Sequence, residues 1–147
     1  MPIAVGITLS FIVALFARSA GLDRERAFYS TVLIVVASYG VLFAAMSGSM
    51  PVLIIESVLM AGFTAAAVAG FRSSQWILIA GLFGHGLFDA VHGHIVENAG
   101  MPPWWPSFCM AYDVGAAGFM AWFSTLPVRS RFSNRGELAS LASLLRQ

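Results

Sequence analysis

A single apolar segment, residues 75–96, holds all three histidines of the chain. His85, Asp89 and His92 follow one another at intervals of four and three residues, so a continuous helix aligns their side chains along one stripe. Imidazole nitrogens and carboxylate oxygens are ligands of zinc and other divalent ions. The spacing therefore predicts part of a metal site, and other segments have to supply the remaining ligands.

Carboxylates in two other apolar segments can complete this site. Glu56 lies in residues 52–71 and Asp113 in residues 107–128. An ionisable side chain inside the hydrocarbon of a membrane costs at least a few kcal/mol, so a group of them indicates function. We expect His85, Asp89, His92 and Asp113 to bind a divalent ion, zinc before others, and we expect the catalytic carboxylates to be Asp113, Glu56 and Asp89.

Four further side chains are secondary candidates: His94, Glu97, Tyr112 and Tyr39. On an ideal helix His94 faces away from His92, and it joins the site only if the chain unwinds near Gly93. Otherwise we expect it to pair with Glu97. The competing interpretation of the whole group is structural, because polar side chains also form hydrogen bonds between membrane helices.

The elements that position these residues follow from composition. The 147 residues are 59% hydrophobic and 10% charged, with a mean hydropathy of +0.81, which is more apolar surface than a soluble core of this size can bury. Five apolar stretches are visible, at residues 3–17, 27–46, 52–71, 75–96 and 107–128. All but the first have the roughly 20 residues that a hydrocarbon core about 30 Å thick requires.

We interpret the short first stretch as a retained span rather than a signal peptide. No basic residue precedes it, and cleavage after Ala20 would put Arg18 where a small residue is needed. The predicted fold is an all-α integral membrane protein: a bundle of five transmembrane helices in residues 1–130, followed by a short amphipathic helix in residues 131–147 on the cytoplasmic membrane surface.

The positions of the arginines predict the orientation of the helices in the membrane. If five helices alternate in direction, every arginine falls on one side: Arg18, Arg24, Arg26, Arg72, Arg129, Arg131, Arg135 and Arg146. The positive-inside rule assigns that side to the cytoplasm, which puts the N-terminus outside and the C-terminus inside. We expect a multi-pass protein of the cell membrane, and its compactness suits a bacterial inner membrane.

This orientation predicts the depth of each ionisable residue below the outer end of the bundle. At about 1.5 Å of rise per residue, Glu56 and His92 lie about 8 Å deep, Asp113 about 10 Å, Asp89 about 12 Å and His85 about 18 Å. The first four are expected to form one layer. His85 is expected below it, as a lower ligand or a supporting hydrogen-bond partner.

Three functions fit these residues. The first is a metal-dependent intramembrane hydrolase that acts on a lipid or another apolar substrate, with the metal activating water and a carboxylate accepting its proton. The second is a subunit of an oligomeric proton or metal-ion transporter or channel. The third is a b-type haem protein with its ligands at a dimer interface, because all histidines lie in one segment.

The choice of residues is similar to that of the intramembrane zinc hydrolases typified by the alkaline ceramidases and the adiponectin-receptor family, which use His, Asp and Ser from several helices. The similarity lies in the kinds of residue and covers no aligned stretch. Those proteins have seven helices and a paired His-x-x-x-His element, whereas this chain has five predicted spans and the sequence His85-x-x-x-Asp89.

Possible partners are membrane lipid and a second copy of the chain. Small residues recur every four positions at Gly62, Ala66 and Gly70, and again at Ala111 and Gly115, which is typical of helix packing within a bundle or between subunits. A net charge of +1 does not indicate nucleic-acid binding. The single cysteine, Cys109, excludes an intrachain disulfide.

Overall fold

The computed structural model describes residues 1–22 and 25–125. Across this part of the chain it contains five α-helices and no strands: α1 (Pro2–Ala20), α2 (Arg26–Ser47), α3 (Met50–Arg72), α4 (Gln75–Ile95) and α5 (Trp105–Thr125). The prediction of an all-helical chain is therefore confirmed there. The amphipathic helix expected in residues 131–147, and the arginines at positions 24, 129, 131, 135 and 146, lie outside the described residues.

Local sequence signals explain where the helices begin and end. Gly21 and Gly48 follow α1 and α2 with φ values of 77° and 71°, a left-handed conformation that glycine adopts without strain. Pro51 occupies the first turn of α3, where no backbone donor is lost. The hydroxyl of Ser74 caps α4 by accepting a hydrogen bond from the Trp76 amide at 3.3 Å.

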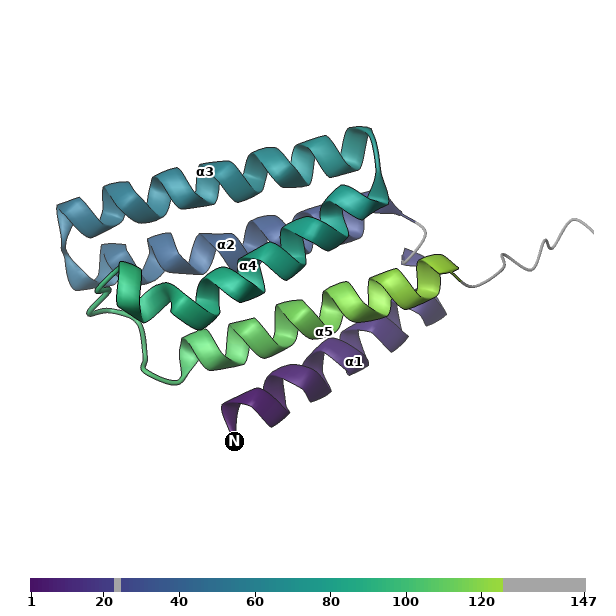
Figure 1. Cartoon of the computed structure of the whole chain (residues 1–147), viewed down its shortest axis with the longest axis horizontal. Helices are drawn as coiled ribbons and strands as arrows, with labels where there is room; N and C mark the ends of the chain where they lie inside the picture. The colour runs from purple at the N-terminus through teal and green to yellow at the C-terminus, as the bar shows by residue number, and fades with distance from the viewer. Residues whose placement is uncertain (23–24, 126–147) are drawn as a thin grey trace, which may run out of the picture.

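Helix α4 lies at the centre of the bundle. It packs along α5 and also contacts α2 and α3, while α2 and α3 pack along each other (Figure 1). The apolar core joins the four helices through almost fully buried side chains such as Leu33, Leu78, Leu82 and Met120. A polar residue on the inner face of α4 can therefore find partners on either side.

Helix α1 packs on α5 through a stripe of small residues. Its buried residues are Gly6, Ser10, Ala14 and Ala17, at intervals of four, four and three. Facing them are Ala111 and Gly115, so the second predicted small-residue face packs within the chain. The first predicted small-residue face lies on α3. There Gly70 lies against Leu78, whereas Gly62 faces open space.

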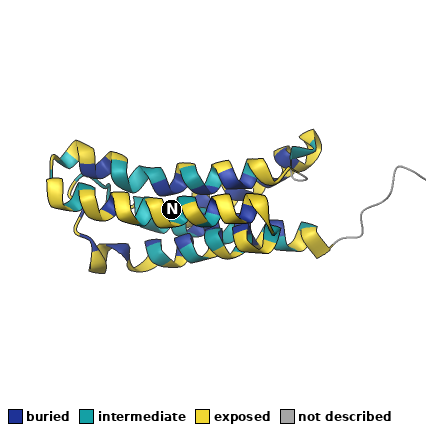
Figure 2. Ribbon diagram, turned by 90° about the horizontal axis from the view of Figure 1, so that it is seen from above, coloured by how far each residue is buried: buried dark blue, intermediate teal, exposed yellow. Residues whose placement is uncertain are grey.

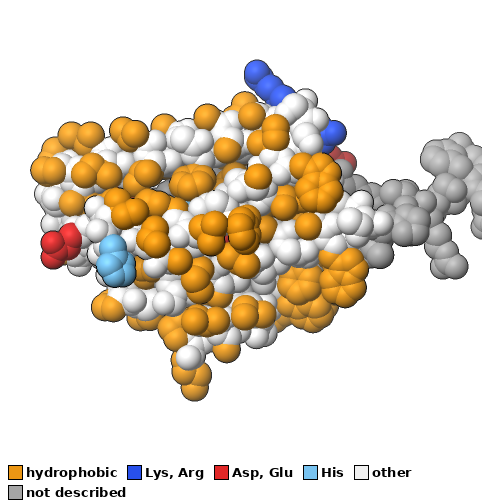
Figure 3. Space-filling model, in the orientation of Figure 1, with side chains coloured by type: hydrophobic (Ala, Val, Ile, Leu, Met, Phe, Trp, Pro, Cys, Tyr) orange, Lys and Arg blue, Asp and Glu red, His pale blue; other side chains and the backbone are white. Residues whose placement is uncertain are grey.

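Many large apolar side chains are exposed on the outside of the bundle. Figure 2 shows exposed residues along the outward faces of the helices, and Figure 3 shows hydrophobic side chains over the visible face. Three helices, α1, α2 and α3, are long and apolar enough to cross a membrane. Helices α4 and α5 have 21 residues each, but they carry the histidines and aspartates discussed above. Arg18, Arg26 and Arg72 lie at helix ends on one side of the bundle, where Arg26 Nη1 donates a hydrogen bond to the carbonyl of Ser73 at 3.0 Å.

Replacing Gly6 with alanine should destabilise the chain. A Cβ atom there would overlap the backbone carbonyl of Phe108, and such overpacking costs about 1–3 kcal/mol, more than the helix propensity of about 1 kcal/mol that alanine gains. The matched control is Gly62→Ala, which meets open space. Thermal unfolding in detergent should show a lower midpoint for Gly6→Ala only; equal midpoints would contradict the described packing of α1.

Candidate metal centre

Three buried side chains from two helices meet in the middle of the bundle. His85 Nδ1 lies 2.7 Å from Asp113 Oδ2 and 3.4 Å from Asp89 Oδ2. Asp113 is 0% exposed, and His85 and Asp89 are each 6% exposed. One nitrogen and two oxygens, one from each residue, all lie within 4.8 Å of one another, close enough that the three residues could hold a metal ion as well as form their ion pairs.

Glycine brings α4 and α5 close together at this point. A Cβ atom on Gly86 would lie 3.1 Å from the carbonyl oxygen of Met110 and 3.3 Å from Cβ of Asp113. A side chain at this position would make unusually tight contacts, so glycine favours the close approach of the two backbones. The approach lets Asp113, a short side chain, reach the imidazole of His85.

The hydrogen bonds of this group are incomplete. Asp89 Oδ2 and Asp113 Oδ1 are buried without a hydrogen-bond partner, although ionised carboxylates accept several hydrogen bonds. Two carboxylates also share a single imidazole, so when both are ionised even a protonated His85 leaves an excess negative charge in an apolar interior. A bound divalent cation fits these residues because it satisfies both carboxylates, taking the place of the proton between His85 and Asp113.

A second buried pair adjoins the first. His92 Nε2 donates to Glu56 Oε1 at 2.8 Å, and the amide of Asn98 donates to the same oxygen at 3.0 Å. The Asn98 amide also reaches the carbonyl of Gly40 at 3.1 Å. A Cβ atom on Gly40 would collide with Glu56 Oε2, so this glycine makes room for the carboxylate. The pair connects α3, α4 and the loop that follows α4.

Aromatic rings hold both imidazoles. Phe63 makes an edge contact with the His85 ring at 4.6 Å, and Phe88 makes one with the His92 ring at 5.2 Å between ring centres. Glu56, His85, Asp89 and His92 all line one cavity of about 20 Å³. This volume accommodates about one water molecule, so the site is small.

The structure brings together the five residues that were predicted to form the site, and it divides them into two groups. His85, Asp89 and Asp113 form the candidate metal centre, whereas the predicted ligand His92 binds Glu56 instead. The predicted gap of about 8 Å in depth between His85 and Asp113 does not keep them apart, since the two side chains are in contact.

The secondary candidates lie outside the cluster. His94 and Glu97 are exposed, and α4 stays helical through residue 95, so the chain does not unwind to bring His94 into the site. Tyr39 and Tyr112 are half-buried and line a different cavity. Asn98 and Gly40 were not predicted from the sequence, where their only signals are an amide next to Glu97 and a glycine opposite an acid.

Comparison of the chain with family models, with curated proteins and with solved structures finds no match in any of the three. The function therefore has to be inferred from the chemistry of the cluster.

Replacing His92 with alanine should lower the free energy of unfolding by about 3–5 kcal/mol, because it leaves the buried carboxylate of Glu56 without its imidazole partner. His94→Ala removes an exposed imidazole two residues along the same helix, where surface changes stay within about 0.5 kcal/mol. Denaturation in mixed detergent micelles measures both values. Equal losses in the two variants would contradict the His92–Glu56 contact.

Proposed function

We propose that the chain is a metal-dependent membrane hydrolase that acts on an apolar substrate such as a lipid, with His85, Asp89 and Asp113 as the ligands of a divalent ion, zinc before others. The observation that carries this proposal is the compact group of three ligand atoms, in which two buried carboxylate oxygens lack a hydrogen-bond partner. Structural clusters normally satisfy such atoms. Carboxylate oxygens without a hydrogen-bond partner are available as ligands for a cation.

We further propose that all five helices cross the cell membrane, with the N-terminus outside. Exposed apolar side chains along the helices support this placement, as does the common location of Arg18, Arg26 and Arg72 at one end of the bundle. In Figure 3 the basic side chains of the visible face gather at that end. The buried acids and histidines lie between the middle of the bundle and its opposite end, which is the outer half in this orientation.

The two buried groups suit the two tasks of hydrolysis. A divalent ion supplies a Lewis acid that polarises a carbonyl and activates water. Hydrolysis joins the oxygen of water to the acyl carbon and breaks the bond from that carbon to an alcohol oxygen or amide nitrogen. A base has to take one proton from the water and pass it to the leaving group. Glu56 lines the same cavity as His85 and Asp89, and His92 and Asn98 orient it for this role.

A one-sided site favours an enzyme over a transporter. The cluster ends at His85, and the part of α4 between Trp76 and Gly84 that leads toward Arg72 is apolar. Among the described residues, no buried acid or histidine continues from the cluster toward the end that holds Arg72. A path for protons or metal ions across a membrane requires polar groups along its length.

Metal analysis tests the ligand set. Protein purified in detergent and supplied with Zn²⁺ should retain about one ion per chain after exhaustive dialysis, as measured by mass spectrometry of the metal. Asp89→Asn and Asp113→Asn should lose most of it, since each removes a charged ligand. Glu97→Gln, which neutralises an exposed carboxylate at the same end of the bundle, should retain it. A metal-free wild type, or equal metal in all variants, would refute the centre.

The rate at which a hydrolysis product is released tests the proposed role of Glu56 as the base. Incubation with a membrane lipid extract should release a hydrolysis product with the wild type, and Glu56→Gln should slow that release about 10²–10⁴-fold while the metal stays bound. Glu97→Gln should match the wild type in both respects. Unchanged turnover in Glu56→Gln would show that Glu56 is not the base. Absence of product, together with proton or metal flux in proteoliposomes, would replace the hydrolase by a transporter.

A further inference from the structure

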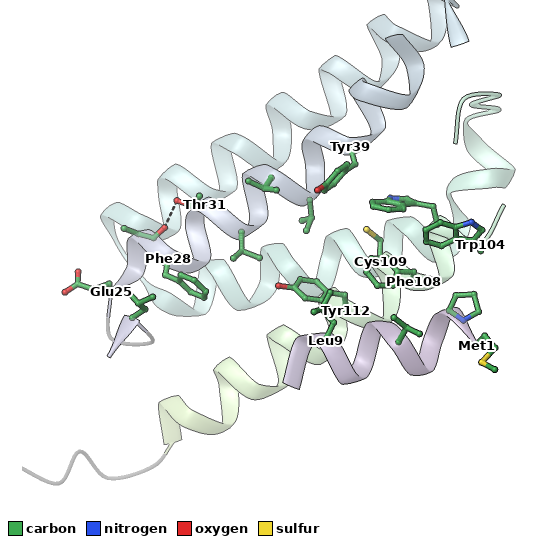
Figure 4. Close-up of a pocket in the computed structure, with 18 residues that line it drawn as sticks. Met1, Leu9, Glu25, Phe28, Thr31, Tyr39, Trp104, Phe108, Cys109 and Tyr112 are labelled. Carbon is green, nitrogen blue, oxygen red and sulfur yellow. Dashed lines mark hydrogen bonds between the residues drawn. The ribbon is translucent and has the colours of Figure 1, made fainter. Parts of the chain in front are cut away.

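A second, much larger cavity of about 1210 Å³ lies between α1 and α2. It exists because α1 packs on α5 and makes little contact with α2. Figure 4 shows Met1 and Leu9 of α1 on one wall and Phe28, Thr31 and Tyr39 of α2 on the other. Behind them α5 provides the back of the cavity through three labelled side chains: Phe108, Cys109 and Tyr112.

The walls of this cavity suit a long hydrocarbon chain. They are apolar along most of their length, and the hydroxyl of Thr31 is already bound to the carbonyl of Ala27 at 2.8 Å. The one charged residue of the described lining, Glu25, lies at the far end. Along α2 the lining extends from Ala27 to Tyr39, a distance of about 18 Å at 1.5 Å per residue. This length exceeds the thickness of one leaflet of hydrocarbon, about 15 Å.

The large cavity adjoins the polar cluster. Val36, Trp105 and Cys109 line both the large cavity and the small one that contains Glu56, His85, Asp89 and His92. Trp105 is held between the two by ring contacts with Tyr39 at 4.8 Å and Phe43 at 5.1 Å. These three shared side chains put the apolar space next to the candidate metal centre.

We propose that the cavity between α1 and α2 binds a hydrocarbon chain of a membrane lipid beside the polar cluster. The identity of that lipid as the substrate rests on the proposed hydrolase, whereas the binding of the chain does not. A hydrocarbon chain is favoured over a helix from a second copy because the polar group at the end of a lipid chain can lie beside the adjoining polar cluster.

Photolabelling tests the chain site. The probe is a phosphatidylcholine with a diazirine in one acyl chain, incorporated with the protein into lipid nanodiscs, irradiated and analysed by peptide mass spectrometry. Adducts should concentrate on the cavity lining, at Leu9 and Val32, and should exceed several-fold those at Val58, which is exposed on α3 outside the cavity. Val32→Trp puts a bulky ring into the middle of the cavity and should reduce labelling of the lining at least threefold, whereas Val58→Trp should leave it unchanged.

Two results would overturn this inference. One is uniform labelling of the cavity lining and of α3, which would describe ordinary lipid around the bundle. The other is an unlabelled lining that instead cross-links to a second copy or to another segment of the chain. Asp113→Asn should label like the wild type, because binding of the chain needs no metal. A wild type that binds metal but shows no labelling of the lining would contradict only this inference. A wild type whose lining is labelled but which binds no metal would contradict only the proposed hydrolase.

Discussion

The contact between His85 and Asp113 lies where an uncompensated charge is most costly, in the apolar middle of the bundle. It ties α4 to α5, as the contact between His92 and Glu56 ties α4 to α3. A slip of one residue along either helix would turn a buried carboxylate away from its imidazole. The two contacts therefore determine how three helices are aligned, which non-directional apolar packing does less strictly. Gly86 and Gly40 serve this arrangement by leaving space where the carboxylates have to enter.

Much of the fold could be predicted from the sequence because strong signals coincide. Four of the five apolar stretches have glycine, proline or arginine within two residues of both limits, and the five helices begin and end within a few residues of the predicted limits. The stripe of His85, Asp89 and His92 was also predictable, since helical spacing alone puts them on one face, and all three are buried. Local periodicity determines these features, and no knowledge of packing is needed for them.

The pairing within the site could not be predicted in the same way. Depth was counted from the loops, which put His85 about 8 Å below Asp113. Counted from the observed helix ends, His85 lies about 15 Å from Ile95 and Asp113 about 12 Å from Trp105 along the helix axes. The two residues are therefore at similar depths and their side chains can meet. Asn98 was missed for a related reason. It lies in the loop after α4, where no periodic pattern applies, and its amide reaches Glu56 only through the folded path of that loop.

Helix α5 shows how one short element can serve three surfaces. Ala111 and Gly115 form the small-residue face that receives α1, and Asp113 projects from between them toward His85. Cys109, one turn before Asp113, lines both cavities. Because successive residues of a helix point in directions about 100° apart, neighbouring positions can hold α1, contact the candidate metal centre and border the apolar cavity. The cavity and the charged cluster are thus adjacent because they lie on neighbouring faces of the same two turns of α5.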